Sequence, residues 1–255
     1  MPERFPILDF DPDPRGIIEP SEQIKKIDIP EHCVFTFFQD VIDSLRTAGK
    51  LEHITSQRSE MGEHPVYEMK HDGRRIAVAH PGMGAPLAGG MLEELIARGC
   101  RKFMACGGCG VLDSSIGVGN VIVPTSALRD EGTSYHYLPP DDEALPSPEA
   151  VDAIKRTLDR HSVPHVEGKT WTTDGVYRET RGLVQKRREQ GCIAVEMETA
   201  AFFAVAQFRD VKLGQILYGG DDVSGKEWDN RGWHAMGSTR EKLFMLAVES
   251  CLEMG

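Results

Sequence analysis

The sequence predicts a single α/β domain, spanning residues 1–255, in which helices cover a mixed central β-sheet. Segments with strand and helix patterns alternate along the chain, and glycine-rich turns follow two of the predicted strands. The chain has 255 residues, of which 40% are hydrophobic and 27% charged, as is usual for a globular protein with a sizeable core. Because no repeat or low-complexity linker divides it, we expect one continuous fold.

The first 50 residues are predicted to form an extended segment and a helix packed on the domain. Prolines are frequent in the first 30 residues, where they oppose regular structure. Apolar residues then recur at helical spacing, at Val34, Phe37, Phe38, Val41, Ile42 and Leu45.

The rest of the chain alternates between predicted strands and predicted helices. Apolar runs predict strands at 75–80, 102–106, 118–127, 168–173 and 213–218, and periodicity predicts helices at 87–98, 179–190, 198–208 and 238–254. Ser238 and Glu241 have the spacing of a capping box at the start of the last helix. Ligands of such sheets bind beyond the carboxyl ends of the strands, so we expect the site near the turns that follow them.

Charge and sequence signals exclude several classes of partner. The formal net charge of −11 opposes binding to nucleic acid or to an anionic membrane. No apolar run approaches the roughly 18 residues of a transmembrane helix, and the N-terminus lacks the order of a signal peptide, so we expect a cytoplasmic protein. Cys106 and Cys109 have C-x-x-C spacing, but no second pair completes a zinc site. We therefore expect no metal and two buried thiols.

The glycines after the two strands are candidates for anion binding. Gly84 lies in the turn 81–86, and Gly107 and Gly108 lie in the predicted turn 107–110. Backbone N–H groups at a strand exit can converge on an anion. Neither turn matches a nucleoside-triphosphate or dinucleotide motif, and a purely structural role for the glycines is an alternative.

Two pairs of carboxylates are candidates for chemistry. If the chain is extended at 194–200, Glu196 and Glu198 point to one face and can accept hydrogen bonds from a ribose diol. The alternative is a structural role, in which one of the two carboxylates caps a helix and the other belongs to a surface glutamate. Asp221 and Asp222 follow a strand and two glycines, and adjacent carboxylates in a poorly solvated site suit a general acid. A solvated turn is the alternative there.

Four segments together resemble the nucleoside phosphorylase family, which includes purine nucleoside phosphorylases, uridine phosphorylases and methylthioadenosine nucleosidases. They are Gly82-Met83-Gly84-Ala85-Pro86, Glu131-Gly132-Thr133-Ser134-Tyr135-His136-Tyr137, Val195-Glu196-Met197-Glu198-Thr199-Ala200 and Asp221-Asp222. The resemblance extends from about Arg58 to Asp222. It implies cleavage of an N-glycosidic bond, without a cofactor, through a transition state that resembles a ribosyl cation.

The resemblance assigns roles to residues by their position. Glu198 and Met197 would hold the ribose with Glu196 nearby, and Asp222, beside Asp221, would protonate a purine nitrogen with support from Arg231. The base pocket would be lined by Thr173, Val176 and Tyr177. Arg58 and Arg15, with glycine amides of Gly84, Gly107 and Gly108, would hold phosphate.

The sequence also departs from the phosphorylase pattern. Ala105 stands at the position of a family arginine, Gly108 replaces a Ser or Thr, and Leu87 replaces a serine. The leading hypothesis is phosphorolysis of a purine nucleoside, or of uridine, to free base and ribose 1-phosphate. Hydrolysis by water is one alternative, and a non-catalytic nucleoside-binding or storage protein is the other. Since Arg58 would serve a neighbouring subunit, we expect a homodimer or a trimer of dimers.

Overall fold

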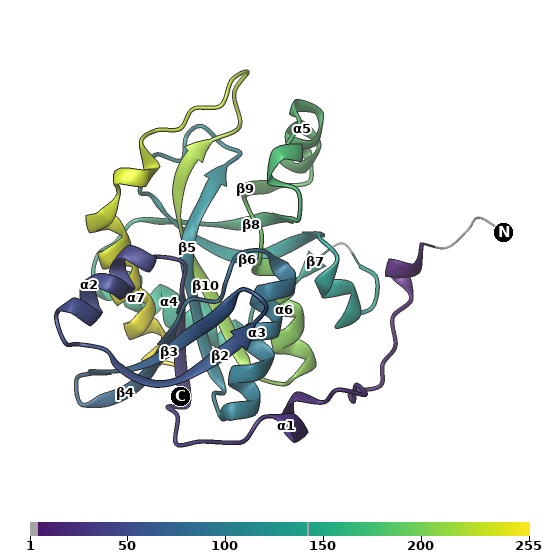
Figure 1. Cartoon of the computed structure of the whole chain (residues 1–255). Coiled ribbons are helices and arrows are strands. Elements are labelled where there is room, and N and C mark those ends of the chain that lie inside the picture. The colour runs from purple at the N-terminus through teal and green to yellow at the C-terminus, as the bar shows by residue number, and fades with distance from the viewer. Residues whose placement is uncertain (1–4, 142) are drawn as a thin grey trace.

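The described residues of the computed structural model, 5–141 and 143–255, contain one mixed ten-stranded sheet with helices on both sides (Figure 1). The strands are β1 His32–Thr36, β2 Glu52–Ser59, β3 Gly62–His71, β4 Arg74–Ala79, β5 Lys102–Val111, β6 Val121–Asp130, β7 Glu143–Ala144, β8 His165–Thr173, β9 Cys192–Glu196 and β10 Lys212–Asp222. The helices are α1 Pro20–Gln23, α2 Gln39–Thr47, α3 Ala85–Arg98, α4 Pro148–Arg160, α5 Arg181–Glu189, α6 Thr199–Phe208 and α7 Gly237–Leu252. Short 3-10 helices lie at Pro6–Leu8, Thr133–His136, Val176–Arg178 and Trp233–Ala235. The predicted fold class is confirmed.

Strand β5 organises the sheet. It pairs in parallel with β1 and β10 and antiparallel with β9. Because β10 also pairs with β6, and β8 joins β6 to β9, these five strands close into a ring. The antiparallel strands β2 and β3 extend the sheet beyond β4. The ends of β5, β9 and β10 are thereby brought to one place.

Two apolar layers hold the helices against the sheet. On one side α2, α4 and α7 bury side chains such as Ile42, Ile154 and Phe244. On the other side α3 and α6 pack together and bury Leu92 and Phe202. Each such side chain contributes about 1.5–3 kcal/mol when it leaves water, so the layers fix the strand ends firmly. None of the helices in the described ranges is long and apolar enough to span a membrane.

Three local predictions were wrong. Residues 32–36 form strand β1, not the start of a helix, because Val34 lies between β4 and β5 and is fully buried. The glycines at 107–110 continue strand β5 and do not form a turn. A Cβ on Gly107 would lie 2.9 Å from the Phe37 ring, so the glycine permits close packing. Helix α7 begins at Gly237 with no side-chain cap, so the capping box at Ser238 does not form.

Candidate active site

A pocket of about 420 Å³ opens where β5, β9 and β10 end. Its floor is glycine-rich, with Gly108 and Gly110 from β5 and Gly220 from β10, and four carboxylates lie in its lining: Glu179, Glu196, Glu198 and Asp221. Aromatic side chains form part of its walls: Phe37, Phe38, Tyr218 and Trp233. A pocket with apolar walls and clustered carboxylates suits a polar organic ligand such as a nucleoside.

Glu196 is held by hydrogen bonds from all sides. Its carboxylate accepts from the Thr172 hydroxyl at 2.7 Å and from the backbone N–H groups of Glu198 and Thr199 at 2.7 and 2.6 Å. Burial raises the pKa of Glu196, although these bonds act in the opposite direction. Because its oxygens are so engaged, Glu196 mainly fixes the backbone that carries Met197 and Glu198.

Glu198 is the carboxyl group best placed to meet a ligand hydroxyl. It accepts from Gly84 N–H at 2.6 Å and lies in the pocket lining with the half-buried Met197. Burial, and then the charge of Glu196, raises the pKa of Glu198 to about 8. At neutral pH the group is therefore mostly protonated and can donate a hydrogen bond. The Gly84 amide, expected to bind phosphate, is bonded to Glu198 instead.

The two aspartates at the end of β10 point to different surroundings. Asp221 lines the pocket and accepts from Trp228 Nε1 at 2.6 Å. Asp222 is buried outside the pocket lining, where it accepts from Arg231 Nη2 at 2.5 Å. Arg231 also donates to the carbonyl oxygen of Ile116 at 2.7 Å. The structure therefore brings Arg231 and Asp222 together, as expected, but it is Asp221 that faces the ligand space.

The expected base-binding residues are only partly at the pocket. Val176 lines it, whereas Thr173 is buried outside it and accepts from Gly175 N–H at 3.2 Å. Tyr177 is 95% exposed and lines a neighbouring hollow. Glu179 lies in the pocket, and burial followed by the charge of Asp221 raises its pKa to about 7. Sequence reasoning missed Glu179, although it follows the predicted base-binding segment directly.

The expected phosphate ligands are mostly distant from this pocket. Gly108 is in its lining, but Gly107 packs against Phe37 inside the fold. The Arg58 side chain is 77% exposed and pairs with Glu63, and Arg15 is 68% exposed and pairs with Glu22. Neither arginine lines the pocket of its own chain.

Two further basic side chains in the lining were not predicted as site residues. Arg240 contacts Asp40 at 3.2 Å and lies 3.4 Å from the Tyr218 hydroxyl. The imidazole of His80 accepts from Gly82 N–H at 3.0 Å, and burial lowers its pKa. Because His80 is neutral at ordinary pH, Arg240 is the fixed positive charge in the described lining. No group of three or more His, Cys, Asp or Glu side chains in the described ranges is arranged to hold a metal ion.

Comparison with known proteins gives the class to which this fold and pocket belong. The family model of the phosphorylase superfamily matches residues 32–252, and the chain therefore belongs to that superfamily. A guanosine phosphorylase from Halorubrum lacusprofundi is 30% identical over 167 residues, which cover 65% of this chain and 69% of the relative. A uridine phosphorylase from Haemophilus influenzae is 26% identical over 159 residues, covering 57% of this chain and 63% of the relative.

The fold is likewise similar to solved structures. A purine nucleoside phosphorylase from Toxoplasma gondii, in complex with immucillin-H, superimposes with a TM-score of 0.77 at 19% identity, covering 94% of this chain and 98% of that one. The family model and the named relatives confirm the resemblance to nucleoside phosphorylases inferred from the four segments, and the solved structure agrees in fold.

Proposed function

We propose that the protein is a nucleoside phosphorylase, a pentosyltransferase that uses inorganic phosphate to cleave a purine nucleoside, or uridine, into free base and ribose 1-phosphate. The observation that carries the proposal is the presence of Glu198 and Asp221 in one pocket of a superfamily chain. One carboxyl group can hold the ribose while the other serves the leaving base. These are the two functions that cleavage of an N-glycosidic bond demands.

In the proposed reaction the bond between the anomeric carbon and the base nitrogen breaks, and its electron pair goes to the base. Asp221 replaces Asp222 as the proposed donor of the proton to the base, because only Asp221 lines the pocket. Burial and the charge of Asp221 raise the pKa of Glu179 to about 7, so Glu179 holds the proton and passes it to the base through Asp221. Protonated Glu198 donates to a ribose hydroxyl, and phosphate oxygen bonds to the anomeric carbon.

The phosphate site is proposed to be shared between subunits. Arg58 and Arg15 lie at the surface of their own chain, where they can serve the pocket of a neighbour in a homodimer or a trimer of dimers. Gly108 and Arg240 supply the nearby groups of the same chain. We expect a cytoplasmic enzyme that needs no metal or organic cofactor and binds no nucleic acid.

Hydrolysis is the second candidate, and one observation favours it. Ala105 is fully buried in β5, and Leu87 packs over Gly82, so neither position offers a phosphate contact. In this case water would attack the anomeric carbon of the same bound nucleoside.

The test is chromatography of the products from inosine, adenosine, guanosine, uridine and methylthioadenosine, with and without phosphate. Ribose 1-phosphate that forms only with phosphate supports phosphorolysis. Free sugar in both buffers identifies a hydrolase, and binding without any product identifies a nucleoside-binding protein.

A further inference from the structure

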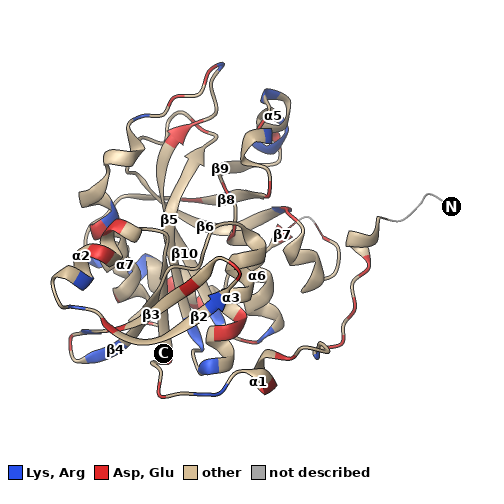
Figure 2. Ribbon diagram, in the orientation of Figure 1, with Lys and Arg blue, Asp and Glu red and all other residues tan. Residues whose placement is uncertain are grey.

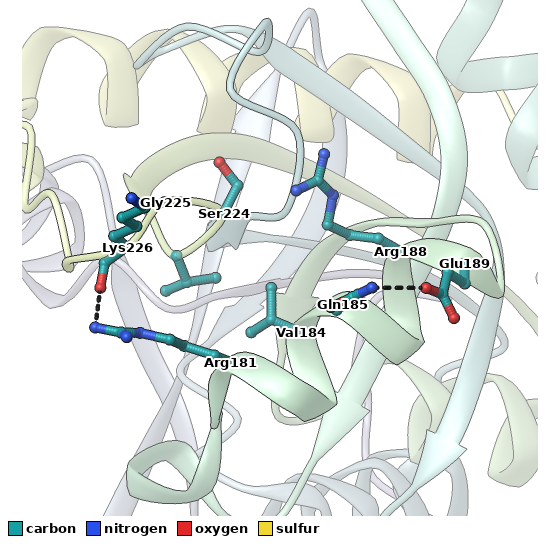
Figure 3. Close-up of a pocket in the computed structure, with 9 residues that line it drawn as sticks. Arg181, Val184, Gln185, Arg188, Glu189, Ser224, Gly225 and Lys226 are labelled. Atoms are coloured by element: carbon teal, nitrogen blue, oxygen red, sulfur yellow. Dashed lines mark hydrogen bonds between the residues drawn. The ribbon is translucent and has the colours of Figure 1, made fainter.

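A second hollow beside the pocket is lined by cations that the proposed reaction does not use. It has a volume of about 720 Å³ and lies between α5 and the segment 223–226 after β10 (Figure 3). Arg181, Arg188 and Lys226 line it, and Figure 2 shows that Lys and Arg gather on α5. On a chain with a net charge of −11, such a cluster is a local exception.

The spacing of the basic residues explains their common direction. Arg181, Val184, Gln185 and Arg188 follow one another at helical spacing, so they share one face of α5. Arg181 donates to the carbonyl oxygen of Lys226 at 2.6 Å and so ties the helix to the 223–226 segment. The cluster is therefore built from two elements that are fixed to each other.

The positive charges of the hollow have no salt-bridge partner among the described side chains, although the Asp113 carboxylate interacts electrostatically with Arg188 without forming a salt bridge. Within the described part of the chain, no carboxylate forms a salt bridge with Arg181, Arg188 or Lys226. Glu189 is the carboxylate among the described lining residues, and it accepts from Gln185 at 3.0 Å. An anionic ligand would supply the missing charge.

The cationic hollow is connected to the proposed active site. A third hollow of about 750 Å³ is the neighbouring hollow that Tyr177 lines. It shares Val176, Glu179, Asp221 and Trp233 with the active-site pocket. It shares Arg181, Val184, Val223, Gly225 and Lys226 with the cationic hollow. Its remaining lining residues are Tyr177, Thr180, Glu227, Trp228 and His234, and the aromatic side chains of Tyr177 and Trp228 are exposed. A ligand can therefore extend from Asp221, past aromatic side chains, to the cations.

We propose that the cationic hollow binds the anionic end of a substituent on the nucleobase. The preferred substrate is then a nucleoside whose base carries an apolar or aromatic chain that ends in a carboxylate or similar anion. The direction in which this substituent extends rests on the proposed function, because Asp221 marks the base end of the ligand and Glu198 its ribose end. The exocyclic nitrogen on carbon 6 of a purine adjoins the nitrogen that Asp221 would protonate, so a substituent there enters the third hollow.

The test compares N6-(ω-carboxyalkyl)adenosines of increasing chain length with N6-alkyladenosines of matching length. Both kcat/KM for cleavage and Kd from calorimetry are measured. At the chain length that reaches the cations, we expect the carboxylate compound to be favoured about tenfold, as for one charge-assisted hydrogen bond. Arg188→Gln and Lys226→Gln should each abolish most of this preference. Lys186→Gln, on the same helix but outside the lining, should keep it.

The outcomes separate this inference from the proposed function. Equal kcat/KM and Kd for charged and neutral compounds at every length would overturn the anion site, while cleavage of adenosine would leave the enzyme assignment intact. An Arg188-dependent preference in binding, without cleavage of these compounds or of the five nucleosides of the first test, would support the anion site and overturn the enzymatic proposal. A protein that binds none of the N6-substituted compounds would overturn the anion site, while cleavage of any of the five nucleosides would leave the enzymatic proposal intact.

Discussion

The variant Glu198→Gln tests the most perturbed group of the site without assuming any reaction. Burial and the charge of Glu196 raise the pKa of Glu198 from the usual 4.5 to about 8. Below pH 4.5 the carboxyl group is protonated in both the folded and the unfolded protein, so it adds no penalty to folding. Between pH 4.5 and about 8 the unfolded chain loses the proton and the folded chain keeps it. The free energy of unfolding of the parent therefore falls over this window.

The size of this effect follows from the pKa shift. A rise from 4.5 to about 8 corresponds to a loss on the order of 5 kcal/mol, complete above pH 8. Glutamine at position 198 cannot ionise, so the variant lacks this loss. Its single carbonyl oxygen can still accept from Gly84 N–H, but the weaker bond from Met197 N–H at 3.3 Å has no second acceptor. That deficit is about 1 kcal/mol.

The assay is urea unfolding of parent and variant from pH 4 to pH 9. We expect the variant to be less stable by about 1 kcal/mol at pH 4, nearly equal to the parent near pH 5 and more stable than the parent at pH 9, so that the two profiles cross. Glu60→Gln, in an exposed turn between β2 and β3, is the control. Its free energy of unfolding should change with pH in the same way as that of the parent. A constant difference between parent and Glu198→Gln over the whole range would refute the reasoning.

The remaining predictions concern the strand ends and the glycines. Asp222→Asn breaks the pair with Arg231 and should lower the free energy of unfolding by about 3 kcal/mol, measured by urea unfolding. Asp221→Asn should instead reduce kcat for nucleoside cleavage by at least about a hundredfold with stability nearly unchanged; equal kinetic losses in both aspartate variants would contradict the assignment. Gly107→Ala places a Cβ 2.9 Å from an aromatic ring and should lower the unfolding free energy by about 1–3 kcal/mol. Gly90→Ala, in α3 with no atom within 4 Å of the new Cβ apart from the adjacent residues and the helix's own backbone, should raise it by up to about 1 kcal/mol, and a loss there would show that the helix is constrained in another way.

Much of the fold could be predicted because its core elements have clear periodicity. The apolar run at 75–80, the glycine turn and the helix at 87–98 correspond to β4 and α3. Strands β2 and β3 were missed, because their residues are mostly polar or half-exposed and leave little hydrophobic signal. Glycines 107–110 were misread as a turn, since a sequence does not reveal which ring will pack against a strand.

The candidate site shows a sharper limit of sequence reasoning. The segment Val195–Ala200 directed attention to Glu196 and Glu198, and both lie in the pocket. For Asp221 and Asp222 the sequence could not decide which side chain faces the ligand, because neighbouring residues of a strand point to opposite sides. The pairing of β10 with β5 shifts register between Gly219 and Asp222, which changes that alternation locally. Only the assembled sheet could therefore separate the two aspartates.

The groups proposed for the nucleoside and those proposed for phosphate lie in different parts of the molecule. The groups proposed for ribose and base, Glu198 and Asp221, belong to one chain and are fixed by strand ends. The arginines proposed for phosphate, Arg58 and Arg15, lie on exposed segments outside the pocket of that chain. Under the proposed function, cleavage of the bond by this pocket would depend on a single chain, whereas the choice of phosphate over water would depend on a neighbouring copy. An oligomer that dissociates should therefore lose phosphate dependence before it loses nucleoside binding.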